Sequence, residues 1–125
     1  MTVSTSGPVV RHHVGARVSE TAIHHGTVYL AGQIPENQPD ADMRGQTQEV
    51  LGHVERLLNE AGSSKAHILS CNIFIRHASD STVMNEVWDA WVVPGHTPPR
   101  CTVIAPALNP KYLIEVVVIG AQIGN

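Results

Sequence analysis

One arginine stands directly before an apolar, strand-forming stretch, and its side chain is well suited to binding a small anion. Arg100 follows Pro98-Pro99 in "TPPRCTVIAPAL", where the prolines keep the chain extended. A guanidinium stays charged, so wherever it is buried it requires an anionic partner. Two interpretations are open: an ordinary ion pair with a carboxylate of the chain, or a bidentate clamp for a carboxylate or phosphate ligand.

Glu115 is the natural second member of such a site. It interrupts the apolar run "LIEVVV" and shares a strand face with Val117 and Ile119. A carboxylate on an apolar face is costly unless it is paired or functional. We expect the strands of Arg100 and Glu115 to be antiparallel neighbours, so that the two charges either pair directly or bracket a ligand. In the second case Glu115 relays protons to and from a water molecule.

The cysteines and histidines give weaker signals. Cys101 follows Arg100, but consecutive strand residues point to opposite faces, and no histidine is placed by spacing as a base for the thiol. We expect Cys71 and Cys101 to be buried free thiols. The pairs His12-His13 and His24-His25 are adjacent instead of four residues apart on a helix, so no metal site is expected.

The elements that position these residues begin with a strand pair. Residues 21–24 and 27–34 have β-type composition and are joined at His25-Gly26, which predicts a hairpin with a tight turn. Pro35 ends the second strand, and the loop "ENQPDADMRG" follows.

Two helices are predicted from apolar residues at helical spacing. The first ends at Gly62, a typical helix C-terminal cap. The second begins at Asp80 or Ser81 and ends at "VPGHTPP". The buried faces consist of Thr47, Val50, Leu51, Val54, Leu57, Leu58 and Ala61 in the first helix, and of Met84, Val87, Trp88 and Trp91 in the second.

Three more strands complete the expected fold. In "HILSCNIFIRH" the alternation predicts a strand with Leu69, Cys71, Ile73 and Ile75 on one face, and residues 101–108 and 113–122 predict two further strands. The order ββαβαββ indicates an α+β domain with two helices on one face of a mixed sheet. The last strand, "LIEVVVIGAQI", is apolar on both sides, so we expect self-association through the uncovered sheet face.

Size and charge limit the class of protein. The 125 residues form one expected domain, residues 1–125, with 8 Lys and Arg against 11 Asp and Glu and a net charge of -3. A nucleic-acid partner is therefore not expected. No run approaches the roughly 18 apolar residues of a membrane span. The start "MTVSTSGPVVRHH" lacks the pattern of a signal peptide, so we expect a cytoplasmic protein with no membrane partner.

Three segments carry a resemblance to a known family. "AGQIP", "MNEVWDAWV" and above all "PPRCTVIAPALNPKYLIEVVVIGA" resemble the Rid (reactive intermediate deaminase, or YjgF) family, and most closely its YoaB-like members with the pattern "WDAWVV.GH.P.RCTV....NPKY..E". The resemblance covers nearly the whole chain from about Val14. It implies a chorismate-mutase-like fold and a homotrimer whose sheets pack together centrally, with a ligand cleft at each subunit interface.

The resemblance also implies an activity and the residues that perform it. The activity is hydrolysis of reactive 2-imino acids and their enamine tautomers to 2-keto acids and ammonia, without a cofactor. Arg100 then holds the substrate carboxylate, and Glu115 positions or activates the attacking water. The backbone around Thr102 and Gly32 contacts the imine nitrogen and its surroundings, and Asn85 matches a helix asparagine near the site.

Two positions depart from the family pattern. Val18 stands where well-known imine deaminases have a cleft-lining tyrosine, and Ala31 where they have a serine before the strand glycine. Both changes remove a hydroxyl group, so the substrate range is expected to differ, while Arg100 retains the common carboxylate anchor. Cys101, beside Arg100, is counted with Val18 and Ala31 among the substrate-binding residues.

Two other functions are compatible with the resemblance. The first is a non-enzymatic trimer that binds a small metabolite, or acts as a chaperone-like stress protein, through the same cleft. The second is a ribonuclease, which the net charge of -3 and the absence of a His/Lys/Arg cluster disfavour.

Overall fold

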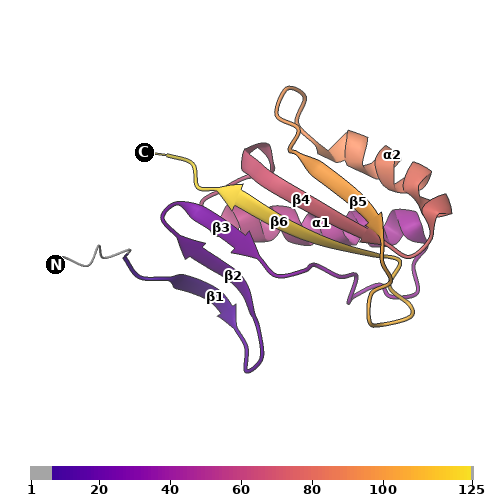
Figure 1. Cartoon of the computed structure of the whole chain (residues 1–125), viewed down its shortest axis with the longest axis horizontal. Coiled ribbons are helices and arrows are strands. Elements are labelled where there is room, and N and C mark those ends of the chain that lie inside the picture. Colours follow the sequence, from indigo (N-terminus) through magenta and orange to yellow (C-terminus); the bar gives the residue numbers. More distant parts are fainter. Residues whose placement is uncertain (1–6, 125) are drawn as a thin grey trace.

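The computed structural model describes residues 7–124 and shows a six-stranded sheet with both helices packed on one face (Figure 1). The α+β prediction is therefore confirmed. The helices are α1 (Met43–Glu60) and α2 (Ser81–Trp91), and short 3-10 turns lie at Lys65–His67 and Ala78–Asp80. The strands are β1 (Val10–Val14), β2 (Ser19–His24), β3 (Thr27–Leu30), β4 (Ile68–Ile75), β5 (Arg100–Ile104) and β6 (Ile114–Ala121).

The order of the strands across the sheet is β1-β2-β3-β6-β4-β5. All neighbouring pairs are antiparallel except β4 and β5, which are parallel. A parallel pair needs a long crossover, and the connection through α2 supplies it. The last strand in the chain, β6, therefore lies in the interior of the sheet.

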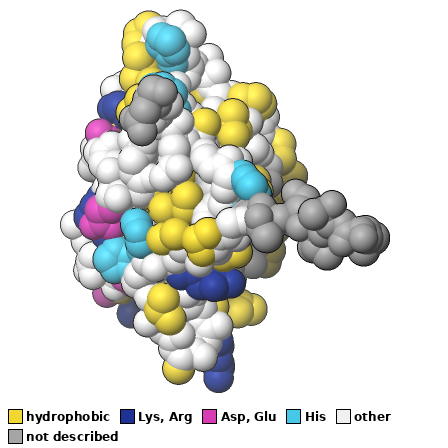
Figure 2. Space-filling model, turned by 90° about the vertical axis from the view of Figure 1, so that its left-hand side faces the viewer, with side chains coloured by type: hydrophobic (Ala, Val, Ile, Leu, Met, Phe, Trp, Pro, Cys, Tyr) yellow, Lys and Arg dark blue, Asp and Glu magenta, His cyan; other side chains and the backbone are white. Residues whose placement is uncertain are grey.

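Strand β1 was not predicted. It pairs antiparallel with β2, with Val10 opposite Ile23. It is an edge strand whose side chains are almost all exposed, so "VRHHV" carries no alternation of apolar and polar residues. Figure 2 shows the left-hand side of the view in Figure 1, where hydrophobic side chains form small separate groups among polar atoms.

The hairpin turn at His25-Gly26 is confirmed. Both residues have positive φ angles, 51° and 77°, as the tight turn of a twisted hairpin requires. The second strand ends at Leu30 instead of Ile34. The chain leaves the sheet at Ala31 and Gly32 and returns at Gln33, which exchanges backbone hydrogen bonds of 2.8 and 3.1 Å with Val116 of β6.

Both ends of α1 are capped, and the C-terminal cap lies at the predicted Gly62. At the N-terminus Asp42 accepts a hydrogen bond of 2.9 Å from the N–H of Gly45. At the C-terminus Gly62 has a φ of 80°, and the N–H of Ser63 reaches back to the carbonyl of Leu58 at 2.9 Å. This is a Schellman motif, in which glycine supplies the left-handed residue.

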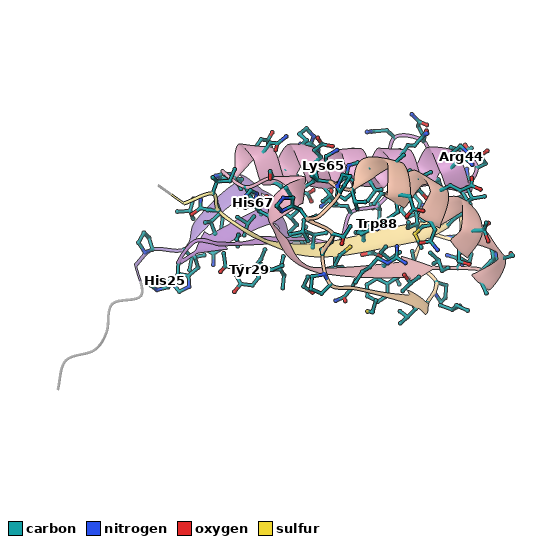
Figure 3. All side chains as sticks on the ribbon, turned by 90° about the horizontal axis from the view of Figure 1, so that it is seen from above. His25, Tyr29, Arg44, Lys65, His67 and Trp88 are labelled. Carbon is teal, nitrogen blue, oxygen red and sulfur yellow. The ribbon has the colours of Figure 1, made fainter. Side chains whose placement is uncertain are left out.

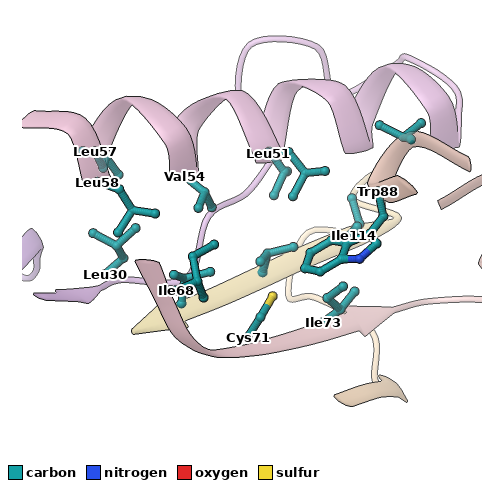
Figure 4. Packing of buried hydrophobic residues seen from close by; sticks show 14 of the residues in the cluster. Leu30, Leu51, Val54, Leu57, Leu58, Ile68, Cys71, Ile73, Trp88 and Ile114 are labelled. Atoms are coloured by element: carbon teal, nitrogen blue, oxygen red, sulfur yellow. The ribbon is translucent and has the colours of Figure 1, made fainter. Parts of the chain in front are cut away.

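The two faces of the sheet have different surroundings. Figure 3 shows Trp88 between α2 and the sheet, and Tyr29 on the open side, away from the helices. The covered side forms the core, in which Leu51, Val54, Leu57 and Leu58 of α1 pack toward β4 and β6 (Figure 4). Trp88 is 6% exposed, whereas Trp91 is half-buried and donates its indole N–H to Glu55 at 3.0 Å.

Strand β4 corrects one predicted face. Leu69 is 50% exposed instead of lying with Cys71 and Ile73 in the core. A β-bulge between Ile68 and Ser70 shifts the alternation by one residue, so Ile68 takes the buried position. Within residues 7–124, neither helix is long and apolar enough to cross a membrane.

Candidate functional site

Glu115 stands where two hollows meet on the open side of the sheet. One hollow, of about 280 Å³, is lined by Gly32, Ile34, Ala107, Leu108, Asn109, Tyr112 and Glu115. The other, of about 250 Å³, is lined by Phe74, Ala105, Pro106, Ala107 and Glu115. Most of the walls come from residues 105–113, which we call the β5–β6 loop. Glu115 is half-buried and shares its strand face with Val117 and Ile119, as predicted.

Gly32 leaves room for this carboxylate in its observed position. A Cβ atom at position 32 would lie 2.1 Å from Oε2 of Glu115, far inside van der Waals contact. The close approach follows from the interruption of β3, which brings Ala31 and Gly32 toward β6. The N–H of Ala31 donates to the carbonyl of Glu20 at 2.9 Å. Ala31, Gly32 and Glu115 are therefore brought together.

Arg100 lies elsewhere, and the predicted pairing of its strand is wrong. Strand β5 pairs only with β4, in parallel, and β4 separates it from β6. The short connection between residues 101–108 and 113–122 suggested a hairpin, but the β5–β6 loop carries the chain across β4. Residue pairing across a sheet depends on such long-range choices, which the local pattern does not encode.

The two charged residues also face opposite sides of the sheet. Arg100 is in register with the core residue Cys71, and its guanidinium lies 5.0 Å from the centre of the Trp88 ring. Glu115 is in register with Phe74. Two strand spacings and three residues along the strand separate their Cα atoms by about 14 Å. Within one chain, therefore, Arg100 and Glu115 neither pair nor bracket a ligand.

Arg100 also forms no ion pair with another carboxylate in the described part of the chain. Among residues 7–124, no carboxylate lies within 4.0 Å of its guanidinium. The side chain is exposed and rests on Trp88, which does not neutralise its charge. The interpretation of Arg100 as an ordinary intrachain salt bridge is thus not supported, and the N–H groups are available to an anion.

Two more predicted residues lie on the side of Arg100. Thr102 is in register with Ile73, and its hydroxyl is buried without a hydrogen-bond partner in the described part of the chain. Asn85 is half-buried on α2, one helical turn before Trp88. The predicted residues thus divide into two groups, one around Arg100 and one around Glu115.

Cys101 and Val18 belong to neither group. Cys101 is exposed, which corrects the prediction of a buried thiol: β5 is an edge strand, and no element covers its open side. The thiol donates to Oδ1 of Asn72 at 3.1 Å. Val18 is 60% exposed in the turn before β2.

Cys71 is the buried thiol that the sequence predicts. Burial raises its pKa to about 12, and the nearby positive charge of Arg100 opposes this shift only in part. Cys71 is therefore a neutral core thiol at physiological pH. This protonation state makes it unsuited to nucleophilic catalysis.

Several residues around Glu115 were not predicted as site residues. Phe74, Asn109 and Tyr112 line the hollows, and Tyr112 belongs to the "NPKY" segment that carried part of the resemblance. Their alternating or turn-like settings give no signal that separates them from ordinary surface residues. Within residues 7–124, no three His, Cys, Asp or Glu side chains are grouped so as to hold a metal ion.

Comparison with known sequences identifies relatives along nearly the whole chain. The model of a family described as "Endoribonuclease L-PSP" matches residues 11–122. The RutC family protein YoaB of Escherichia coli strain K12 is 44% identical over 113 residues, which cover 90% of this chain and 97% of YoaB. A RutC family protein of Haemophilus ducreyi is 36% identical over 113 residues, covering 90% and 96% of the two chains.

Solved structures show the same fold. A member of the YjgF protein family from Neisseria meningitidis superposes with a TM-score of 0.92 at 34% identity, covering 97% of this chain and all of that one. A protein of the conserved Rid family from Yersinia pestis gives a TM-score of 0.78 at 29% identity, with 86% and 90% of the chains covered. The chain therefore belongs to the Endoribonuclease L-PSP family, which includes the RutC and YjgF (Rid) proteins.

Proposed function

We propose that this protein hydrolyses reactive 2-imino acids and their enamine tautomers to 2-keto acids and ammonia. The observation that carries the proposal is a pair of charged groups without ion-pair partners in residues 7–124: the Arg100 guanidinium, and the Glu115 carboxylate between two hollows. Together they supply an anchor for a carboxylate and an acceptor for a proton.

The two groups serve one substrate only if the site is completed between chains. We infer a homotrimer in which the open sheet faces pack together, and in which the Arg100 edge of one subunit meets the Glu115 hollow of the next. Apolar side chains on the open face support this arrangement, among them Tyr29 at 47% exposure and Val103 at 43%. A monomer would leave them in water.

Each residue then has a defined task in the reaction. Arg100 holds the substrate carboxylate through two parallel N–H bonds. A water oxygen bonds to the imine carbon while Glu115 takes one of its protons and passes it to the nitrogen, which receives the electrons of the C=N double bond. Glu115 then carries the hydroxyl proton of the carbinolamine to the nitrogen, the C–N bond breaks, and ammonia leaves with a 2-keto acid as the other product.

The proposed reaction requires only a modest rate acceleration. Imines already hydrolyse in water, so orientation and proton transfer worth on the order of a few kcal/mol suffice. The steps move only protons and electron pairs between substrate, water and side chains, so the proposed reaction uses no cofactor.

Ribonuclease activity fits the site less well. Among residues 7–124 of one chain, no lysine or arginine lines the hollows beside Glu115, so the neighbouring subunit's Arg100 would supply one basic group to a protein with a net charge of -3. Binding of RNA depends on basic groups that neutralise phosphates. The description of the family model therefore gives a weaker guide to activity than the lining of the site.

A coupled assay tests the proposal. An amino-acid oxidase or a pyridoxal-phosphate-dependent dehydratase generates the imine, and semicarbazide traps whatever has not been hydrolysed. We expect the protein to raise the rate of keto-acid formation and to lower the yield of semicarbazone. An unchanged rate over several imino acids, combined with measurable keto-acid binding, would instead support the non-enzymatic ligand-binding function.

A further inference from the structure

The charged side chain of Arg76 donates hydrogen bonds to backbone carbonyls. This residue follows β4 directly, and its guanidinium donates three hydrogen bonds: to the carbonyl of Ala107 at 2.8 Å, of Asn109 at 3.0 Å and of Tyr112 at 3.1 Å. In the part of the chain that the structure describes, no carboxylate lies within 4.0 Å of it. All three acceptors belong to the β5–β6 loop.

Other hydrogen bonds hold the two ends of this loop, at Ala105 through the backbone and at Lys111 and Leu113 through Gln46 of α1. The middle of the loop has few other contacts of this kind. The loop contains no helix or strand, and Pro106 and Pro110 have no N–H to donate. Its internal hydrogen bonds are confined to the turn at Asn109, which accepts from the N–H groups of Lys111 and Tyr112. The charged fork of Arg76 therefore attaches the middle of the loop, at Ala107 and Asn109, to the end of β4.

The same loop forms most of the wall around Glu115. Ala107 lines both hollows, and Asn109 and Tyr112 line the larger one. Arg76 bonds to the carbonyls of these three residues, yet it lines neither hollow itself. A displacement of the loop would change the shape of both hollows without removing any side chain from them.

We propose that Arg76 is a positioning residue for the Glu115 site, which acts through the β5–β6 loop and does not contact the substrate. This role rests on the proposed function of that site. Catalytic groups must be held to within a fraction of an ångström, so a loosened wall impairs turnover even when the fold is intact. Arginine is suited to the task because its planar fork reaches several carbonyls at once, which lysine cannot do.

The test compares Arg76→Gln and Arg76→Lys with a matched control, Arg56→Gln, which alters an exposed arginine on α1 near Glu60. Hydrogen exchange is measured at the amides of Lys111 and Tyr112, which donate to Asn109 within the loop. For Arg76→Gln we expect these amides to exchange at least about tenfold faster, with α1 unchanged. The exchange rate in Arg76→Lys should lie between those of Arg76→Gln and the unaltered protein. The rate in Arg56→Gln should equal that of the unaltered protein.

Kinetics separate a positioning role from a purely structural one. With the fold intact at the assay temperature, kcat/KM for a 2-imino acid should fall about 10- to 100-fold in Arg76→Gln and recover partly in Arg76→Lys. Unchanged loop exchange would overturn the proposal. So would faster loop exchange with unchanged kcat and KM, because Arg76 would then be structural only.

A binding measurement keeps this result distinct from the proposed function. If the unaltered protein accelerates no imine hydrolysis, the proposed function fails, and titration with 2-oxobutanoate decides the role of Arg76. Weaker 2-oxobutanoate binding in Arg76→Gln, with normal binding in Arg56→Gln, supports positioning of the hollow. Equal binding in all variants, or none in the unaltered protein, overturns it.

Discussion

Arg100 keeps its hydrogen-bonding capacity because an aromatic ring supports it. A guanidinium 5.0 Å from the centre of the Trp88 ring gains a cation–π contact worth about 0.5–1 kcal/mol at an exposed site. The contact is not a hydrogen bond, so it leaves the N–H groups of the guanidinium free to bind an anion. Trp88 therefore holds the Arg100 side chain without accepting a hydrogen bond from it. The N–H groups of Arg100 stay free to bind a carboxylate.

Substitutions at the two charged positions should have different effects. Arg100→Lys keeps the charge but loses the fork, so carboxylate binding should weaken by about 1 to 3 kcal/mol, and Arg100→Ala should nearly abolish acceleration. Glu115→Gln keeps its size but loses proton acceptance, so keto acids should bind while kcat falls. Titration and steady-state kinetics measure the two effects.

The control for both substitutions is thermal stability. If Arg100 and Glu115 variants lower the melting temperature and leave turnover unchanged, the two residues have structural roles and the proposed reaction is wrong.

The two cysteines should differ in reactivity. With a pKa of about 12 against an ordinary value of 9.0, Cys71 stays a neutral thiol in the folded protein, and it is buried. Iodoacetamide at pH 9 should therefore label only Cys101, and label Cys71 after unfolding in urea; mass spectrometry of peptides distinguishes them. The folded state holds the Cys71 proton more tightly than the unfolded state does. The contribution of Cys71 to the free energy of unfolding is therefore fully present below about pH 9 and is lost between about pH 9 and 12.

Labelling of Cys71 in the folded protein at the rate of Cys101 would contradict its burial. Replacement of Cys101 by alanine should leave most turnover intact, since no step of the proposed reaction uses its thiol.

At the scale of elements, α1 anchors two loops through one buried side chain. Gln46 is 1% exposed, and its amide donates to the carbonyls of Pro39, Ala41 and Lys111 at 2.9 to 3.1 Å. Its carbonyl accepts from the N–H of Leu113 at 2.7 Å. One glutamine thus ties the loop before α1 to the segment that leads into β6.

Gln46→Leu should destabilise the protein by at least about 2 kcal/mol, because it leaves several buried backbone groups without partners. Urea unfolding measures the change at fixed protein concentration. Gln48→Leu, the same change at an exposed position of α1, is the control and should stay within about 0.5 kcal/mol. Equal effects of the two substitutions would show that the Gln46 hydrogen bonds contribute nothing specific.

The sequence correctly predicts those structural features that depend only on residues close together in the chain. The turn at His25-Gly26 and the helix end at Gly62 follow from the local conformational freedom of glycine. The bulge that exposes Leu69 and the placement of β6 between β3 and β4 depend on tertiary packing, so no local pattern shows them. The Arg100–Glu115 separation was missed for the same reason: the local pattern draws attention to each residue, but their relation depends on strand order.

At the scale of the whole molecule, the open sheet face predicts association. We expect sedimentation to give a trimer at micromolar concentration. Ile119→Lys, which places a charge on the half-buried open face of β6, should dissociate it and reduce turnover. Gln48→Lys on α1 adds the same charge and should leave the trimer intact. A stable, active monomer would contradict both the burial argument and the proposed site between chains.

The position of β6 also determines when the chain can fold during synthesis. Strand β6 alone joins β1-β2-β3 to β4-β5, and it is made last, from residues 114–121. Until the ribosome has released it, the two parts of the sheet have no hydrogen bonds to each other, and the core side chains of β3 and β4 lack the strand between them. The sheet can therefore be completed only after residue 121 has emerged, and these long-range contacts make folding slow and expose the nascent strands to aggregation.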